Sequence, residues 1–140
     1  LPISKVFDLL AALLEWNDLT LSAPTAASIS AKDQEAMQSL KHFLLQNYST
    51  KVDLQRLAQM CYMSKSKLTY LFRMLYGTTI YEFILACRID RAKELLADRE
   101  KKLSEIAALV GYERQSSFSA AFHQKTGVTP NEFRRQFWNK

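Results

Sequence analysis

The sequence repeats itself at an offset of 50 residues, and this repeat constrains the fold more than the composition does. Identical pairs at this offset include Tyr62 with Tyr112, Ser66 with Ser116, Phe72 with Phe122, Gly77 with Gly127, Thr79 with Thr129, Glu82 with Glu132, and Phe83 with Phe133. Upstream the offset falls to 49, where Ala58 meets Ala107, so one copy has an extra residue in a turn, where insertions are tolerated. Such a period is typical of one supersecondary unit used twice.

Each copy has the pattern of a helix-turn-helix. Apolar residues at helical spacing end at a turn, and a second amphipathic helix follows, with a stop signal and a Thr-x-x-Glu capping box after it. These signals are the turn at 61–63, the N-cap Ser64, the stop Gly77 and the box Thr79–Glu82 in the first copy, and the turn at Gly111, the stop Gly127 and the box Thr129–Glu132 in the second. Two helical hairpins that pack only for stability are the alternative. They explain the recurrence of turn, stop and cap less well.

The rest of the chain is also helical in pattern, so we expect an all-α protein. A helix over residues 31–48 precedes the first unit (about 50–79), and a long connecting helix over about 80–97 leads to the second unit (about 102–128). Residues 3–16 have the spacing of an amphipathic helix, and residues 21–30 have the composition of a linker. We therefore expect a domain boundary near residue 30, with residues 1–29 ahead of a domain over 30–140.

Charge is unevenly placed along the chain, whose net charge is +5. Residues 1–35 hold two basic and five acidic side chains, whereas residues 36–140 hold 17 and nine. A basic lobe suits a polyanion such as nucleic acid. No apolar run approaches the roughly 20 residues needed to span a membrane. The two cysteines form no CxxC pair or Cys/His cluster, so we expect a cytoplasmic protein without a metal or cofactor.

The second helix of each copy is the candidate reading helix, because in DNA-binding versions of this unit that helix enters the major groove. In the first copy Ser66, Thr69 and Tyr70 share the face that packing leaves exposed, and their hydroxyls suit base edges. The flanking residues Lys65, Lys67 and Arg73 suit phosphates. For a lone helix an ordinary solvated face would be the simpler interpretation, but the repeat and the local positive charge favour DNA.

In the second copy the base-facing candidates are Gln115, Ser116, Ser119 and Ala120. Gln115 can bind adenine through two hydrogen bonds, whereas Ala120 offers only an apolar contact. The phosphate-facing candidates are Arg114, which also suits guanine, and Lys125. This face has fewer long polar side chains, so we expect it to discriminate bases less strongly than the first.

Residues from about 50 to 138 resemble the AraC/XylS family of bacterial transcription regulators. The stretch that carries the resemblance runs from Ile106 to Arg134: an alanine-bearing helix, a Gly-aromatic turn, a Ser-x-Phe helix, and then Phe-x-x-x-x-Gly-x-Thr-Pro-x-x-aromatic-Arg. The resemblance implies two homeodomain-like, three-helix subdomains joined by a long helix. Their reading helices would meet adjacent major-groove segments about one turn apart. The family often has Arg where Ala120 stands, which puts strong base readout by the second copy in doubt.

The resemblance also implies partners and a role: a sequence-specific transcription regulator, usually an activator, that binds double-stranded DNA and RNA polymerase and is not an enzyme. The chain begins at Leu1 rather than Met, so we expect an upstream region to be missing. The resemblance implies that such a region forms a homodimer or binds a small-molecule effector. Residues 1–20 fit the end of such a region, or equally a helix packed on the DNA-binding lobe.

Two rival functions come from other classes. Some alkylation-repair proteins attach this unit to a methyl-accepting cysteine, which requires an exposed and activated thiolate. Cys61 lies on the packing face of the first unit and Cys87 on the connecting helix, without an activating partner in the sequence pattern. The other rival is a protein-interaction module that has lost DNA binding, and the retained basic charge argues against it.

Overall fold

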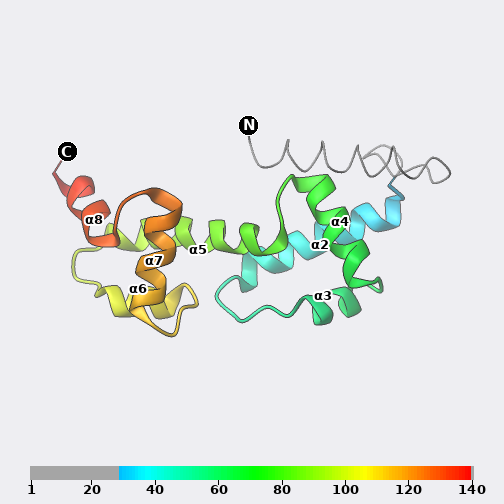
Figure 1. Ribbon diagram of the computed structural model, residues 1–140, viewed down its shortest axis with the longest axis horizontal. Coiled ribbons are helices and arrows are strands. Elements are labelled where there is room, and N and C mark those ends of the chain that lie inside the picture. The colour runs from blue at the N-terminus through cyan, green and yellow to red at the C-terminus, as the bar shows by residue number, and fades with distance from the viewer. Residues whose placement is uncertain (1–28, 140) are drawn as a thin grey trace. The chain divides into compact units, whose positions relative to one another are not determined.

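The computed structural model describes residues 29–139, which form seven helices and, within that range, no strand (Figure 1). The helices are α2 (Ala31–Asn47), α3 (Leu54–Met60), α4 (Lys65–Tyr76), α5 (Ile80–Leu96), α6 (Leu103–Leu109), α7 (Gln115–Thr126) and α8 (Pro130–Trp138). The all-α prediction is confirmed. The predicted helix over 3–16 and most of the predicted linker lie outside the described residues.

The described residues pack as two compact units. Unit 1 comprises residues 29–44 and 52–83, and unit 2 comprises residues 45–51 and 84–139. The boundary falls inside α5, between Phe83 and Ile84. The sequence pattern does not predict that residues 45–51, which are the end of α2 and the start of the connection to α3, belong to unit 2.

Unit 1 is built from one apolar face each of α2, α3 and α4. Its buried residues are Ile29, Met37, Leu40, Leu44, Leu57, Ala58, Leu68, Leu71, Phe72 and Ile80. The small side chain of Ala58 is buried where α3 contacts α4. Burial of Leu68, Leu71 and Phe72 fixes the rotation of α4 and so determines which of its residues face solvent.

Unit 2 repeats this arrangement with α6, α7 and α8 packed against the second part of α5. Its core consists of Ile89, Ala92, Leu96, Ile106, Ala107, Val110, Phe118 and Phe122. One aromatic contact recurs in both units: the ring of Phe72 lies 5.6 Å from that of Phe83, and the ring of Phe122 lies 5.5 Å from that of Phe133, both edge to face. The repeat in the sequence is therefore a repeat of side-chain packing.

The predicted helix signals are present in the structure. The Ser64 side chain accepts a hydrogen bond from the Lys67 backbone N–H, and Gly77 and Gly127 end α4 and α7 with left-handed backbone conformations. Both capping boxes form. The backbone N–H of each threonine (Thr79, Thr129) donates to its glutamate, and the backbone N–H of the glutamate donates back to the threonine hydroxyl.

One predicted equivalence is wrong: Tyr62 does not correspond to Tyr112. The Tyr62 N–H bonds to the carbonyl three residues back, as the Gly111 N–H does in the second unit, and Met63 N–H bonds to Ala58 as Tyr112 N–H bonds to Ala107. Tyr62 therefore occupies the position of Gly111, and the extra residue of the second turn follows Tyr112. Backbone hydrogen bonds define this register, and the tyrosine that both turns share stands at different positions in them.

Candidate nucleic-acid interface

The N-terminal turn of α4 presents its polar side chains to solvent. Ser64 caps this turn, and burial of Leu68 fixes how the helix is rotated, so Lys65, Ser66 and Lys67 are all exposed. In a helix-turn-helix these N-terminal residues are the ones that approach base edges. These three side chains are therefore accessible to a ligand, which is a precondition for the roles predicted for them.

One turn further along α4, Thr69 and Tyr70 are half-buried. The Thr69 hydroxyl donates to the Lys65 carbonyl oxygen at 2.8 Å, so its hydrogen is committed to the helix backbone. What Thr69 offers to a base is then its oxygen lone pairs and its methyl group, a narrower set than the sequence suggests. Arg73 is half-buried in the last turn of α4, which leaves it less accessible than the two lysines.

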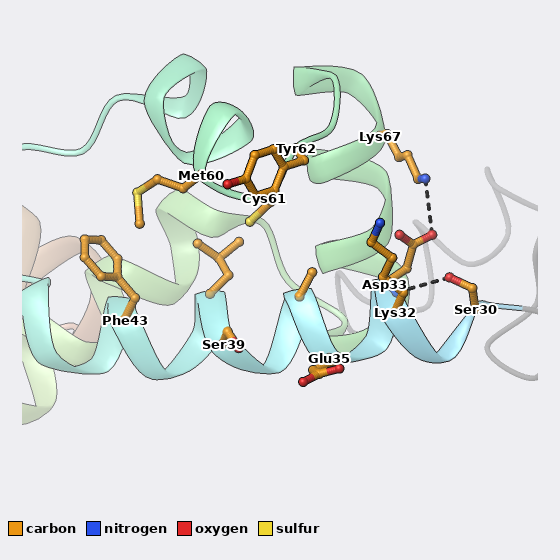
Figure 2. Close-up of a pocket in the computed structure, with 12 residues that line it drawn as sticks. Ser30, Lys32, Asp33, Glu35, Ser39, Phe43, Met60, Cys61, Tyr62 and Lys67 are labelled. Carbon is orange, nitrogen blue, oxygen red and sulfur yellow. Dashed lines mark hydrogen bonds and ion pairs between the residues drawn. The ribbon is translucent and has the colours of Figure 1, made fainter.

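A groove of about 560 Å³ lies beside α4 in unit 1, between α2 and the α3–α4 turn (Figure 2). Apolar and sulfur-containing side chains line one part of it: Phe43, Met60, Cys61 and Tyr62. At its other end the Lys67 Nζ lies 3.2 Å from the Asp33 Oδ2. Lys67, a phosphate-facing candidate, is thus already paired with a carboxylate of α2, which the sequence pattern does not predict.

The face of α7 in unit 2 is less polar. Gln115, Ser116 and Ala120 are exposed and Ser119 is half-buried, whereas the N-cap residue Arg114 makes no side-chain capping bond. Arg114 is itself exposed, as is Lys125 near the end of the helix. Of the residues expected at this face, Arg114, Gln115, Ser116, Ala120 and Lys125 are accessible and Ser119 is less so, with Gln115 as the long hydrogen-bonding side chain at the N-terminus.

Two arginines outside the predicted set hold loops of unit 2 through backbone carbonyls. Arg134 on α8 donates to the carbonyl oxygens of Leu96, Asp98 and Lys101 at 2.7–3.3 Å, and so fixes the α5–α6 loop. Arg88 on α5 makes a similar set of bonds to the connection between α2 and α3. Sequence reasoning missed both roles because carbonyl acceptors 33 to 40 residues away carry no side-chain signature.

Neither cysteine has the environment of an activated thiolate. Burial raises the pKa of the Cys61 thiol, and burial together with the Asp90 carboxylate raises the pKa of the Cys87 thiol. A raised pKa leaves less thiolate at neutral pH. Residues 29–139 also contain no group of His, Cys, Asp or Glu side chains that could hold a metal ion.

Comparison with known proteins shows to which family this chain belongs. Residues 57–136, more than half of the chain, match a family described as "Helix-turn-helix domain". A structure of a "transcriptional regulator (AraC-type DNA-binding domain-containing proteins)" from Chromobacterium violaceum superimposes with a TM-score of 0.65 at 24% identity, covering 75% of this chain and 96% of that one. The chain belongs to the AraC/XylS family. It has the fold of the family's DNA-binding domain, with α4 and α7 as the second helices of its two helix-turn-helix units.

Two curated relatives of this AraC/XylS chain are each about twice as long as the segment that matches it. "Probable transcriptional regulator LumQ" from Photobacterium leiognathi is 32% identical over 119 residues, which are 81% of this chain and 48% of LumQ. The "Bifunctional transcriptional activator/DNA repair enzyme AdaA" from Bacillus subtilis is 31% identical over 103 residues, which are 74% of this chain and 49% of AdaA. The chain thus spans about half the length of these relatives. None of the helices described here is long and apolar enough to cross a membrane.

Proposed function

We propose that this chain is the DNA-reading part of a sequence-specific bacterial transcription regulator, acting in the cytoplasm on two adjacent major-groove segments. The observation that carries the proposal is the first turn of α4. It is capped, its inner face is buried, and Lys65, Ser66 and Lys67 are exposed together. The LumQ and AdaA names support regulation of transcription as the role.

The contacts divide into two kinds. Base discrimination comes from Ser66, Thr69 and Tyr70 on α4 and from Gln115, Ser116, Ser119 and Ala120 on α7. Phosphate attraction comes from Lys65, Lys67, Arg73, Arg114 and Lys125. Phosphate contacts release counterions and make affinity fall with salt, whereas base contacts set the sequence. We propose that residues 30–140 form the DNA-binding domain.

The finer partners follow from the regulator role. We propose that this regulator contacts RNA polymerase, and that a preceding region provides the homodimer contact or the small-molecule effector site. Pull-down of RNA polymerase on promoter DNA, with and without this chain, tests the first. Mass measurement of the protein in solution tests the second.

Selection of duplexes from a random pool tests the proposal as a whole. Enrichment of a defined sequence, with affinity that falls steeply as salt rises, is the expected result. Recovery of unselected sequence with a flat salt dependence would reject it.

AdaA combines this kind of domain with repair, but the cysteines here do not favour methyl transfer, since the pKa of each thiol is raised. We therefore propose a non-enzymatic role for the described residues. Incubating the chain with methylated DNA and measuring the mass of the protein tests this. Transfer of a methyl group to either cysteine would overturn it.

A further inference from the structure

Arg88 binds three backbone carbonyls that come from two separate segments of unit 2. Its Nε donates to the Tyr48 oxygen at 2.7 Å, one Nη donates to the Thr50 oxygen at 3.2 Å, and the other donates to the Gly111 oxygen at 3.3 Å. Charge-assisted hydrogen bonds of this kind are stronger than neutral ones, and the planar guanidinium fixes their directions. Arg88 therefore joins the segment 48–50 to the turn before α7.

The turn also rests directly on that segment. A Cβ on Gly111 would lie 2.6 Å from the Ser49 carbonyl oxygen and 2.9 Å from the Ser49 Cα, so the two backbones are in contact. Because Arg88 holds the carbonyls on either side of Ser49, it fixes the surface on which Gly111 packs. The turn has no freedom to shift toward that surface.

A second path leads from Arg88 to α7 itself. The guanidinium carbon lies 5.0 Å from the centre of the Tyr112 ring, a cation–π contact. The Tyr112 ring lies 5.9 Å from that of Phe118, which is fully buried on the inner face of α7. The Arg88 side chain thus contacts the backbone of the turn directly. Through the Tyr112 ring it is also linked to Phe118, the first buried residue of α7.

We propose that Arg88 is a positioning residue for α7. It holds the helix so that Gln115 and Ser116 are placed for base contact, and it makes no contact with the bases itself. The proposal rests on the DNA-reading function given above. Three of the five N–H groups of the guanidinium are used by carbonyls, two in the segment 48–50 and one in the turn, so its donors are engaged mainly within unit 2. A lysine could not replace it, because one ammonium group cannot reach three carbonyls in these directions.

The test compares Arg88→Gln with Arg91→Gln in the full chain. Arg91 lies on the same helix, is exposed, and pairs with Glu94 at 2.7 Å, so its replacement removes the same charge without touching the turn. Affinities are measured on the selected duplex and on duplexes in which one half-site at a time is scrambled. For Arg88→Gln we expect a loss of about tenfold on the intact duplex, the scale of one well-formed base contact.

The affinity losses at the two half-sites distinguish a positioning role for Arg88 from a general loss of folding or binding. Scrambling the α7 half-site should cost Arg88→Gln little further affinity, whereas scrambling the α4 half-site should cost it as much as it costs the wild type. Arg91→Gln should behave as the wild type on all three duplexes. Equal behaviour of the two variants, or equal loss at both half-sites, would overturn the proposal.

Arg88→Lys serves if Arg88→Gln does not fold, because it keeps the charge and the aliphatic stem. Its expected result is a smaller loss confined to the α7 half-site, and loss at both half-sites again overturns the proposal. A wild-type chain that selects no sequence would reject the DNA-reading function itself, which is a different outcome from either variant result.

Discussion

Tyr62 and Gly111 occupy the same position in the two helix-turn-helix turns, and both have positive φ, at 55° and 105°. The similarity ends at the side chain. Tyr62 is 93% exposed, whereas Gly111 lies against the backbone of Ser49. One turn therefore tolerates a large residue at the cost of backbone strain, and the other accepts glycine alone.

Replacing Gly111 with Ala should destabilise the protein by more than about 2 kcal/mol, because the new methyl overlaps a backbone that cannot move away and adds strain at positive φ. Gly127→Ala is the matched control. Its φ is also positive, at 84°, but nothing lies within 4 Å of the added Cβ, so the cost should be strain alone, about 1 kcal/mol. Urea unfolding of both variants measures the difference, and equal losses would contradict the packing of Gly111 on Ser49.

Replacing Tyr62 with Gly should leave stability unchanged or raise it by up to about 1 kcal/mol. Glycine removes the left-handed strain but adds freedom to the unfolded chain, and the two effects oppose each other. Urea unfolding checks this too. A large loss of stability would mean that the exposed ring makes a contact that its exposure does not suggest.

Asp33→Asn should strengthen DNA binding by up to about fivefold, because an ion pair at the surface, such as that of the exposed Lys67 with the half-buried Asp33, contributes about 0.2–1 kcal/mol that phosphate binding has to overcome. The freed Lys67 would contact phosphate and steepen the log–log salt dependence by up to about 0.9. Glu35→Gln is the control, since Glu35 is an exposed residue of the same helix and carries the same charge. Titration at several salt concentrations measures both effects, and identical results for the two variants would show that only net charge matters.

Thr69→Val should keep more of the base preference at the α4 half-site than Thr69→Ala, because the hydroxyl hydrogen is already donated to Lys65 and the methyl remains in valine. Tyr70→Ala should also relax the preference there. Competition between duplexes that differ at single bases gives the measurement. Should Thr69→Val lose as much discrimination as Thr69→Ala, the threonine oxygen rather than the methyl would carry the contact.

Local sequence signals predict this fold well, whereas the long-range contacts to the backbone cannot be predicted from the sequence. Ser64, Gly77 and the two capping boxes act within a few residues, so their roles could be stated from spacing alone. The Phe72–Phe83 and Phe122–Phe133 contacts follow from the same repeat. That residues 45–51 belong to unit 2 could not be foreseen, because the Arg88 bonds to Tyr48 and Thr50 end on backbone carbonyls, which have no sequence signature.

The candidate site shows the same division. Which face of α4 is exposed follows from the helical period, so Lys65, Ser66 and Lys67 could be named in advance. The pairing of Lys67 with Asp33 and the internal bond of Thr69 depend on rotamers and on a neighbouring helix. These details change which chemical groups remain available to DNA, and only the structure supplies them.

Both cysteines should react slowly with a maleimide near neutral pH. Burial raises the pKa of each thiol, so the reactive thiolate becomes abundant only at a pH above the ordinary range of a free cysteine. Labelling rates of Cys61→Ser and Cys87→Ser across pH 7 to about 10 assign the remaining thiol in each case. Rapid labelling of either cysteine at pH 7 would contradict the burial and reopen a covalent role.

Selection of bound duplexes from a random pool, repeated with Tyr70→Ala and Gln115→Ala, tests most directly the claim that α4 and α7 read different sequences. We expect two unlike segments with centres about one helical turn apart, roughly 10 base pairs. The sharper segment should be flattened by Tyr70→Ala alone, and the weaker one by Gln115→Ala alone. A single enriched segment, or two identical segments that respond together to either variant, would contradict it.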